Sequence, residues 1–311
     1  MQITLIHNPG AGGAGQANPK HPDRAALEGL LREAGHGVFY QSAAEEDWDT
    51  ALKRPADLVV VAGGDGTVAR VARRLAALPD APAFAALPLG TANNIGQSLG
   101  LMRHAMAAHV AHWPRAARAR LDVGVAHGPW GEEQFIEGMG LGLFAWMMPK
   151  ADESGALAAI TDPDAALGYA LRMLRRQLET HQPERINATL DDRDISGDYL
   201  MFEAMNIPNI GPNLFLAPEA RPDDGLLDVV MVDEHHRGEL LETLADWHEG
   251  KPTPPVLPTV RGKRLRIEPI ASNVHMDDKM WQPGDNERPA RADIEVTLRA
   301  GVVEVLLPPE D

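Results

Sequence analysis

The chain has 311 residues, of which 44% are hydrophobic and 24% charged, and its formal net charge at pH 7 is −16. This length suits two domains of ordinary size, and the composition excludes wholesale disorder. The acidic balance excludes nucleic acid as the main partner, and the absence of cysteine excludes disulfides, thiolate zinc sites and a cysteine nucleophile.

No targeting or membrane-spanning segment is expected. The residues from Met1 to Ile6 lead directly into a glycine-rich loop, without the basic and apolar regions of a signal peptide. No run reaches the roughly 18 consecutive apolar residues that a transmembrane helix needs. The sequence therefore predicts a cytoplasmic protein without a transmembrane segment.

The first 118 residues or so alternate between short apolar strands and amphipathic helices, the order of an α/β fold. In chain order we expect a strand at 3–6, a helix at 23–34, a strand at 38–41, a short helix at 45–52, a strand at 58–62, a helix from 68, a strand at 84–87 and a short helix. The run at 58–62 is apolar throughout, which is typical of a strand covered on both faces in a parallel sheet.

Three of these strands end in glycine-rich loops, at 8–13, 63–67 and 90–94. The carboxyl ends of parallel strands meet at one edge of the sheet, and ligands of open α/β sheets bind there. We therefore expect the three loops to lie side by side and to form a binding site together.

The loop at 63–67 reads Gly63-Gly64-Asp65-Gly66-Thr67. Glycines let backbone N–H groups approach a phosphate closely, and the N-terminus of the following helix adds a positive dipole. A carboxylate in such a loop suits a Mg²⁺ ion that accompanies the phosphates, so Asp65 is a candidate metal ligand. The alternative is that Asp65 or Thr67 only caps the helix.

The other two loops are weaker signals when taken alone. The loop that begins with Asn8 lacks the Lys and Ser/Thr of a P-loop and the spaced glycines of a dinucleotide fold, so it is either a phosphate loop or an ordinary turn. The loop at 90–94 offers the Thr91 hydroxyl and the amides of Asn93 and Asn94 to a ribose or a base. Helix capping by Thr91 or Asn93 is the alternative.

From about residue 121 the pattern changes to short strands separated by turns, with one helix among them. We expect strands at 121–126, 134–138, 185–190, 199–206, 227–232, 263–268, 293–298 and 302–307, a helix at 165–179 and a proline-rich linker at 251–258. This is the pattern of an antiparallel β domain with a helical insertion.

Two adjacent carboxylates, Asp223 and Asp224, precede a glycine and an apolar strand in this second half. They are a candidate general-base site, although such a pair at a strand entrance is more often a solvated turn. His109 with His112, and the pair His235-His236, lack carboxylates at ligand spacing, so no metal centre is expected there. The methionine-rich stretch at 139–148 is either core or the wall of an acyl-chain pocket.

Four motifs in order resemble the diacylglycerol kinase catalytic family, which includes bacterial lipid kinases and sphingosine and ceramide kinases. They are Asn-Pro-x-x-Gly at 8–12, Gly-Gly-Asp-Gly-Thr at 63–67, Pro-Leu-Gly-Thr-Ala-Asn-Asn at 88–94 and Asp-Asp-Gly-Leu-Leu-Asp-Val at 223–229. The likeness covers most of the chain. The four motifs in this order are specific, whereas any single one is not.

The resemblance implies a Rossmann-like, nucleotide-binding α/β domain at 1–118, rejoined by residues of about 300–309. It also implies an antiparallel β-sandwich domain for the lipid substrate at 119–299. The implied activity is transfer of the γ-phosphate of ATP to a hydroxyl of diacylglycerol or a related lipid. The enzyme would meet that lipid at a membrane surface through peripheral, transient contact.

The resemblance also implies a role for each motif. ATP would be held by Asn8, Gly63, Gly64, Asp65, Gly66, Thr67, Gly90, Thr91 and Asn93. Asp65 would organise the Mg²⁺ and Asp224 would be the general base toward the lipid hydroxyl. The sequence leaves open which lipid is the acceptor, which nucleotide is the donor, and the oligomeric state, a homodimer included.

Two departures from the family pattern concern the site. Ala11 stands where the family usually has Ser, and Asp277-Asp278-Lys279 stands where the family has Asp-Gly-Glu. These departures support an alternative, a catalytically impaired nucleotide- or lipid-binding protein. NAD kinases share Gly-Gly-Asp-Gly-Thr, but the sequence lacks their second signature, which resembles Pro-Thr-Gly-Ser-Thr-Ala-Tyr, so an NAD kinase is less favoured.

Overall fold

The computed structural model describes residues 1–12, 21–154, 159–160, 162–251, 254–268, 272–283 and 293–308, without the side chains of 149–154. Backbone contacts divide the chain into two compact units. The first comprises Met1–Leu121, Ala158–Ala165 and Gly301–Asp311, and the second Asp122–Leu157 and Ala166–Ala300. Gly13 of the first expected loop, residues 252 and 253 of the expected linker and residue 309 lie outside the described residues.

The first unit is built on a parallel sheet, as predicted. Its strands are β1 (Gln2–His7), β2 (Gly37–Ser42), β3 (Leu58–Gly63) and β4 (Phe84–Pro88), in the order β4-β3-β1-β2. All three pairings are parallel. The last part of β20 (Ile294–Leu306) adds a further parallel neighbour to β4, with Val305 opposite Phe84.

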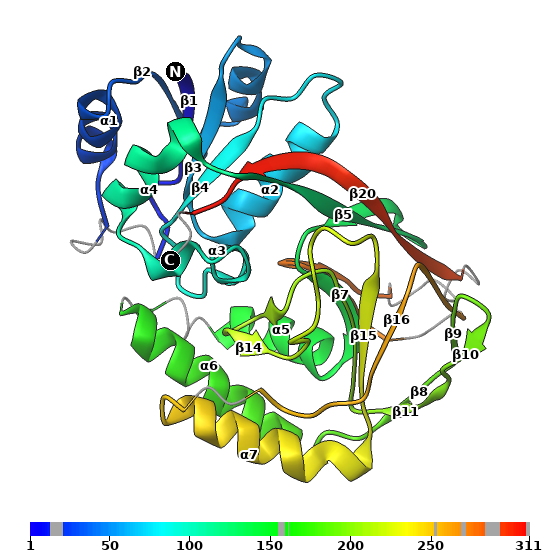
Figure 1. The fold of residues 1–311 in the computed structure, drawn as a ribbon. Helices are drawn as coiled ribbons and strands as arrows, with labels where there is room; N and C mark the ends of the chain where they lie inside the picture. Colours follow the sequence, from blue (N-terminus) through cyan, green and yellow to red (C-terminus); the bar gives the residue numbers. More distant parts are fainter. Residues whose placement is uncertain are drawn as a thin grey trace. The chain divides into compact units, whose positions relative to one another are not determined.

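Helices cover this sheet (Figure 1). They are α1 (Arg24–Glu33), α2 (Asp65–Ala76), α3 (Asn94–Ser98) and α4 (Met106–His112), with 3₁₀ turns at Trp48–Lys53, Leu101–Arg103 and Trp113–Arg115. Leu27 of α1 and Val110 of α4 join one apolar core with alternate strand residues such as Leu5 and Val60. The helix expected at 45–52 is a 3₁₀ turn, a form usual for short pieces.

The second unit is antiparallel, again as predicted. Its larger sheet has the order β16-β15-β12-β7-β18-β19. The bounds are β7 (Gly138–Gly142), β12 (Met201–Met205), β15 (Leu227–Val232), β16 (Thr259–Gly262), β18 (Val274–Met276) and β19 (Lys279–Trp281). All five pairings in this sheet are antiparallel.

Further strands form a second layer of this unit. The first half of β20 pairs with β17 (Arg264–Ile267), which pairs with β9 (Ala188–Leu190), and β9 pairs with β10 (Arg193–Asp194). In the same layer, β5 (Arg118–Gly128) pairs with β20 and with β6 (Gly131–Phe135). Two separate two-stranded sheets pair β8 (Glu184–Ile186) with β11 (Gly197–Tyr199), and β13 (Asn209–Ile210) with β14 (Leu214–Phe215).

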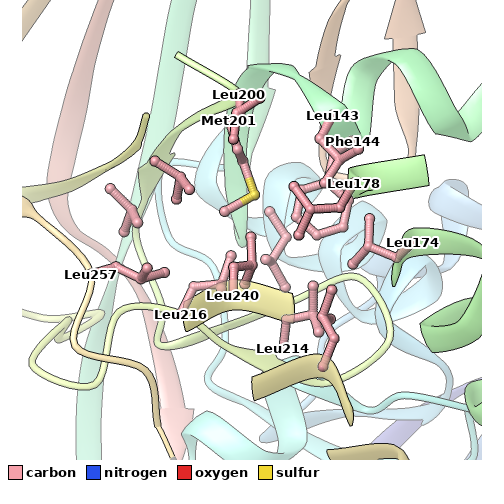
Figure 2. Close-up of a cluster of buried hydrophobic side chains, with 14 of the residues drawn as sticks. Leu143, Phe144, Leu174, Leu178, Leu200, Met201, Leu214, Leu216, Leu240 and Leu257 are labelled. Atoms are coloured by element: carbon pink, nitrogen blue, oxygen red, sulfur yellow. The ribbon is translucent and has the colours of Figure 1, made fainter. Parts of the chain in front are cut away.

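Two apolar cores stabilise the second unit. One unites Leu141 and Phe202 of the larger sheet with Leu265 and Ile294 of the second layer, which makes the pair of sheets a β-sandwich. The other, shown in Figure 2, packs the opposite face of the larger sheet against α5 (Leu143–Ser154), α6 (Pro163–Leu178) and α7 (Arg237–His248). The unit therefore has a sheet–sheet–helix arrangement.

Several elements differ from the sequence predictions; strands β16, β18 and β19, for example, were not expected. Helix α5 was not expected, because its first half is apolar throughout and its second half is polar, so it lacks the one-sided pattern of a surface helix. Helix α7 was also missed, since only Leu240, Thr243 and Leu244 are buried along it. The strands expected at 293–298 and 302–307 are one strand, β20, which continues through Gly301 at φ 60°.

Among the described helices, none is both long and apolar enough to cross a membrane.

Candidate functional site

The three glycine-rich loops meet at the carboxyl edge of the parallel sheet. They follow β1, β3 and β4, which are neighbours in the order β4-β3-β1 and run in the same direction. The prediction that these loops share one edge is confirmed. Their hydrogen bonds and close approaches show how tightly they interlock.

Asn8 joins the first loop to the second. Its Nδ2 donates to Thr67 Oγ1 at 3.0 Å, and its Oδ1 accepts the N–H of Gly10 at 3.0 Å. Its own N–H donates to Ala62 O of β3 at 2.9 Å. Asn8 therefore fixes the shape of its own turn and holds that turn against the start of α2.

Glycine is required where the second and third loops touch. A Cβ added to Gly90 would lie 2.6 Å from Gly64 Cα, and a Cβ added to Gly64 would lie 3.0 Å from Gly90 Cα. Gly12 has φ +71°, and a Cβ there would lie 2.8 Å from Leu89 O. The backbones of the three loops thus approach more closely than side chains would allow, and the surface that they present consists of main-chain atoms.

Asp65 ties α2 to the beginning of α3. Its Oδ1 accepts the N–H of Ile95 at 3.0 Å. Burial raises the pKa of Asp65, and the N–H groups of Ile95, Asn94 and Asn93 oppose that rise. Helix α2 begins after Gly64 without a side-chain cap, so neither Asp65 nor Thr67 caps its own helix.

The residues around Asp65 fit a Mg²⁺ ion that is held mainly by its nucleotide. In the described part of the chain, no three His, Asp or Glu side chains cluster as a metal site would require. Mg²⁺ in phosphate-transfer sites is commonly held by one or two carboxylates, substrate phosphates and water, so a single carboxylate is compatible with it. The assignment of Asp65 as its ligand stays a prediction.

The third loop is closed by Asn93. This residue has left-handed backbone (φ 55°), its Oδ1 accepts the Gly90 N–H at 2.7 Å, and its Nδ2 donates to Gly90 O at 2.9 Å. The amide therefore shapes the loop and does not cap α3. Thr91 is partly exposed within the same loop. Nucleotide contacts by Thr91 and Asn93 stay predictions.

In the second unit, the structure separates the roles of the two adjacent carboxylates. Asp223 pairs with the neighbouring Arg221 at 3.2 Å. Asp224 instead accepts the N–H of Leu226 with Oδ1 at 3.0 Å and a hydrogen bond from Arg261 with Oδ2. Its side chain keeps 21% exposure, so it is held in place and still accessible.

Two buried carboxylates beside this turn were not predicted to have a role. Asp122 Oδ2 accepts the Gly225 N–H at 2.7 Å, and its own N–H donates to Pro222 O at 2.7 Å. Asp228 is 1% exposed, and burial raises its pKa to about 6 although Arg261 opposes the rise. A sequence signal existed, since each is a lone carboxylate inside an apolar strand.

The residues that depart from the family pattern make regular contacts in the structure. Lys279 Nζ is 2.6 Å from Glu133 Oε2, in a partly exposed ion pair. Asp277 has φ 50°, and its carboxylate accepts the N–H groups of Ile136 and Glu137, the latter at 2.8 Å. The Ala11 N–H donates to Asn8 O at 3.2 Å. None of the three residues disrupts the loops.

Comparison with known families matches nearly all of this chain. Residues 2–126 match the model of the diacylglycerol kinase catalytic domain. Residues 153–307 match the model of the YegS C-terminal NAD kinase beta sandwich-like domain. The two matched segments follow the order of the parallel and antiparallel sheets described above.

Curated relatives carry related names. The chain is 25% identical to "Diacylglycerol kinase" of Bacillus subtilis over 61% of its own length and 60% of that protein. It is 34% identical to "Probable lipid kinase YegS-like" of Pseudomonas aeruginosa over 66% of each. These alignments thus span slightly less than two thirds of each relative.

A solved structure supports the fold over the full length. The crystal structure of a diacylglycerol kinase from Bacillus anthracis superposes with a TM-score of 0.67, covering 99% of this chain and 97% of that one. The sequence identity is 19%, so this likeness concerns the fold.

Proposed function

Because this chain belongs to the diacylglycerol kinase catalytic-domain family, we propose that it is an ATP-dependent lipid kinase. The acceptor would be a hydroxyl of diacylglycerol or a related lipid, met at a membrane surface by transient contact. The observation that carries the proposal is the interlocked set of three glycine loops at the carboxyl edge of the parallel sheet. The names of the relatives support the reaction class.

The loops supply what a nucleotide triphosphate needs. Backbone N–H groups at the start of α2 and the positive end of that helix favour the phosphates. Asn8 and Asp65 hold the loops in one arrangement before the nucleotide arrives, so less binding energy is lost on ordering them. Bound Mg²⁺ would neutralise phosphate charge beside Asp65.

At the acceptor end, Asp224 is the proposed general base. In the transfer, the lipid hydroxyl oxygen forms a bond to the γ-phosphorus while the bond to the bridging oxygen of ADP breaks. The hydroxyl proton passes to the Asp224 carboxylate, late in a largely dissociative reaction. The arrangement of Asp224 suits this role, because both of its oxygens are held and one edge is exposed.

A second candidate function is a nucleotide- or lipid-binding protein with impaired catalysis. The observation that favours it is Lys279, which pairs with Glu133 at the position where the family carries an acidic residue. It predicts nucleotide binding without transfer.

The test is transfer of labelled phosphate from ATP and Mg²⁺ to a panel of lipids in detergent micelles. We expect the wild type to label one lipid, and Asp224→Asn to lower the rate by at least about 100-fold with ATP binding nearly unchanged. Asp223→Asn is the matched control, because the adjacent carboxylate pairs with Arg221 and should be dispensable.

Three outcomes separate the candidates. Equal loss in both variants would indicate damage to the turn, and wild-type turnover in Asp224→Asn would remove it as the base. ATP binding with no labelled product from any lipid would favour the binding protein.

A further inference from the structure

Helix α6 presents a cluster of arginines to solvent. One side of the helix enters the apolar core of the second unit, where Figure 2 shows Leu174 and Leu178. Arg172, Arg175 and Arg176 lie three and four residues apart on the opposite side, and all three are exposed. The helix is therefore fixed on its apolar side and offers its arginine side to a partner.

The three guanidinium groups lack partners within the chain. Among the described residues, none of them forms an ion pair or a hydrogen bond. Like charges at this spacing repel and weaken a helix, and the chain has 45 acidic residues with which to balance them. The helix dipole favours cations in the last turn, which accounts for Arg175 and Arg176 but not for Arg172.

Helix α7 extends this basic surface on one side. A Cβ added to Gly168 of α6 would lie 3.5 Å from Arg172 Nη1 and from His248 Cε1, so His248 is next to Arg172. At the other end of α7, Arg237 donates to Leu178 O and joins the two helices, which lie alongside each other in Figure 1. The surface therefore spans two helices of one unit.

Acidic groups offset only part of this positive charge. Asp164 lies about 12 Å along the helix before the first arginine. Surface charges farther apart than about 8 Å are largely screened in physiological salt. Glu249 of α7 pairs with Lys251 at 2.8 Å. Three arginines against Glu179, directly after the helix, and the exposed Glu242 of α7 leave a local excess of positive charge.

We propose that the face formed by Arg172, Arg175 and Arg176 docks onto the headgroups of an anionic phospholipid bilayer. The choice of partner rests on the proposed function, in which the acceptor is a lipid at a membrane surface. The partly exposed Tyr169 and Met173 flank the arginines and suit the boundary between headgroups and acyl chains. Because the apolar side of α6 is already packed in the core, the contact is electrostatic and reversible.

Sedimentation with vesicles tests this face without relying on turnover. The full chain should bind vesicles of phosphatidylcholine mixed with phosphatidylglycerol, less so at high salt, and should not bind phosphatidylcholine alone. Each arginine at an anionic surface contributes about fivefold to the binding constant. The triple variant Arg172→Gln/Arg175→Gln/Arg176→Gln should therefore bind the mixed vesicles on the order of 100-fold more weakly.

The matched control removes the same charge elsewhere in the second unit. Arg185→Gln/Arg264→Gln/Arg266→Gln has the same net charge, but each of its arginines is exposed and already paired with an acid. This variant should bind the mixed vesicles like the wild type. Thermal unfolding of each variant identifies misfolded protein, and glutamine is chosen because it is a good helix former.

Lysine at the three positions distinguishes a bilayer from a protein partner. A bilayer surface responds mainly to charge, so the triple lysine variant should bind within about threefold of the wild type. A folded acidic protein that grips the guanidinium groups in pairs of hydrogen bonds would require arginine. A loss in the lysine variant as large as in the glutamine variant would thus overturn the bilayer as the partner.

The remaining outcomes separate this inference from the proposed function. Equal binding of the wild type and the α6 glutamine variant to mixed vesicles would overturn the docking face, and so would an equal loss in the control variant. In neutral detergent micelles, we expect the α6 variant to transfer phosphate at the wild-type rate. A wild type that binds mixed vesicles through α6 but phosphorylates no lipid would contradict the proposed function and leave the docking face intact.

Discussion

Asp224 and Asp228 are four residues apart and share one arginine, yet their surroundings differ. Asp224 lies in a turn with 21% of its side chain exposed, whereas Asp228 lies on β15 at 1% exposure. Burial raises the pKa of Asp228 to about 6, with Asp224 and Glu219 adding to the rise and Arg261 opposing it. Asp228 therefore titrates close to neutrality.

This pKa predicts how stability depends on pH. The pKa of Asp228 is 3.8 in the unfolded chain and about 6 in the folded one. Between these two pH values, the folded chain holds a proton on Asp228 that the unfolded chain has lost. The stability contributed by this group is thus present below about 4 and is lost as pH rises through 6. Asp228→Asn removes the effect, so the stability of the variant relative to the wild type should rise by about 2 kcal/mol between pH 4.5 and pH 7.5.

Urea unfolding of both proteins at the two pH values measures this difference. Asp198→Asn is a suitable control, because Asp198 is 67% exposed and its removal should leave the pH dependence unchanged. A stability difference between Asp228→Asn and wild type that is the same at pH 4.5 and 7.5 would contradict the assignment of the raised pKa to Asp228.

At the scale of elements, the loops depend on close backbone approach. Gly90→Ala would place a Cβ 2.6 Å from Gly64 Cα, a main-chain atom that cannot rotate away. We expect the second and third loops to separate, with a loss of about 1–3 kcal/mol in unfolding free energy, typical of overpacking. We also expect ATP affinity to fall at least tenfold, because both loops would change shape.

Isothermal titration with ATP and thermal unfolding test this prediction together. Gly29→Ala in α1 is the control, since a Cβ there meets nothing within 4 Å and Ala is the better helix former. Wild-type ATP affinity in Gly90→Ala would contradict the requirement for glycine where the second and third loops touch.

The elements that sequence reasoning found are those whose pattern is local. The apolar run of β3 and the glycine loops after β1, β3 and β4 each show their structure within about ten residues. Helix α5 was missed because Leu143, Phe144, Ala145 and Met147 of its first half are all buried, which leaves no one-sided pattern there. The break expected before Gly301 is absent because glycine continues β20 at positive φ.

In the candidate site, too, local motifs could be recognised from the sequence, whereas contacts between distant residues could not. Sequence motifs located Asp65 and Asp224, but they could not assign partners that lie 30 or more residues away. Asp65 accepts the N–H of Ile95, and Asp224 is held by Arg261. Arg261 belongs to no motif; the pairing of β15 with β16 places it opposite Asp228, and its side chain also reaches Asp224 in the turn before β15. The nucleotide and lipid contacts themselves stay predictions.

Across the whole molecule, both units bury polar side chains. In the first, these include Thr4 of β1, Glu28 of α1 and Asn93 of the third loop. The second buries an ion pair inside, between Glu203 of β12 and His275 of β18, at 0% and 1% exposure. The pair reaches across β7 above Gly140, which lies opposite both residues and whose added Cβ would lie 1.9 Å from Glu203 Oε2.

This pair has consequences for the stability of the second unit. His275→Leu leaves Glu203 buried without its 2.8 Å partner and should lower the unfolding free energy by about 3–5 kcal/mol. Glu203→Met together with His275→Leu removes both charges next to Phe144 and the apolar core of Figure 2. The double variant should therefore recover most of the loss, because replacing a whole buried ion pair by apolar groups is often neutral.

Chemical denaturation of the wild type, both single variants and the double variant completes a thermodynamic cycle. A strong favourable coupling between the two substitutions is expected, and a double variant as unstable as the sum of the single ones would contradict it. The cycle also separates two explanations for keeping such a pair. A double variant that is stable but no longer unfolds in a single sharp transition would indicate that the pair maintains the register of β12, β7 and β18. The reason is that the hydrogen bond between Glu203 and His275 forms in only one alignment of these strands.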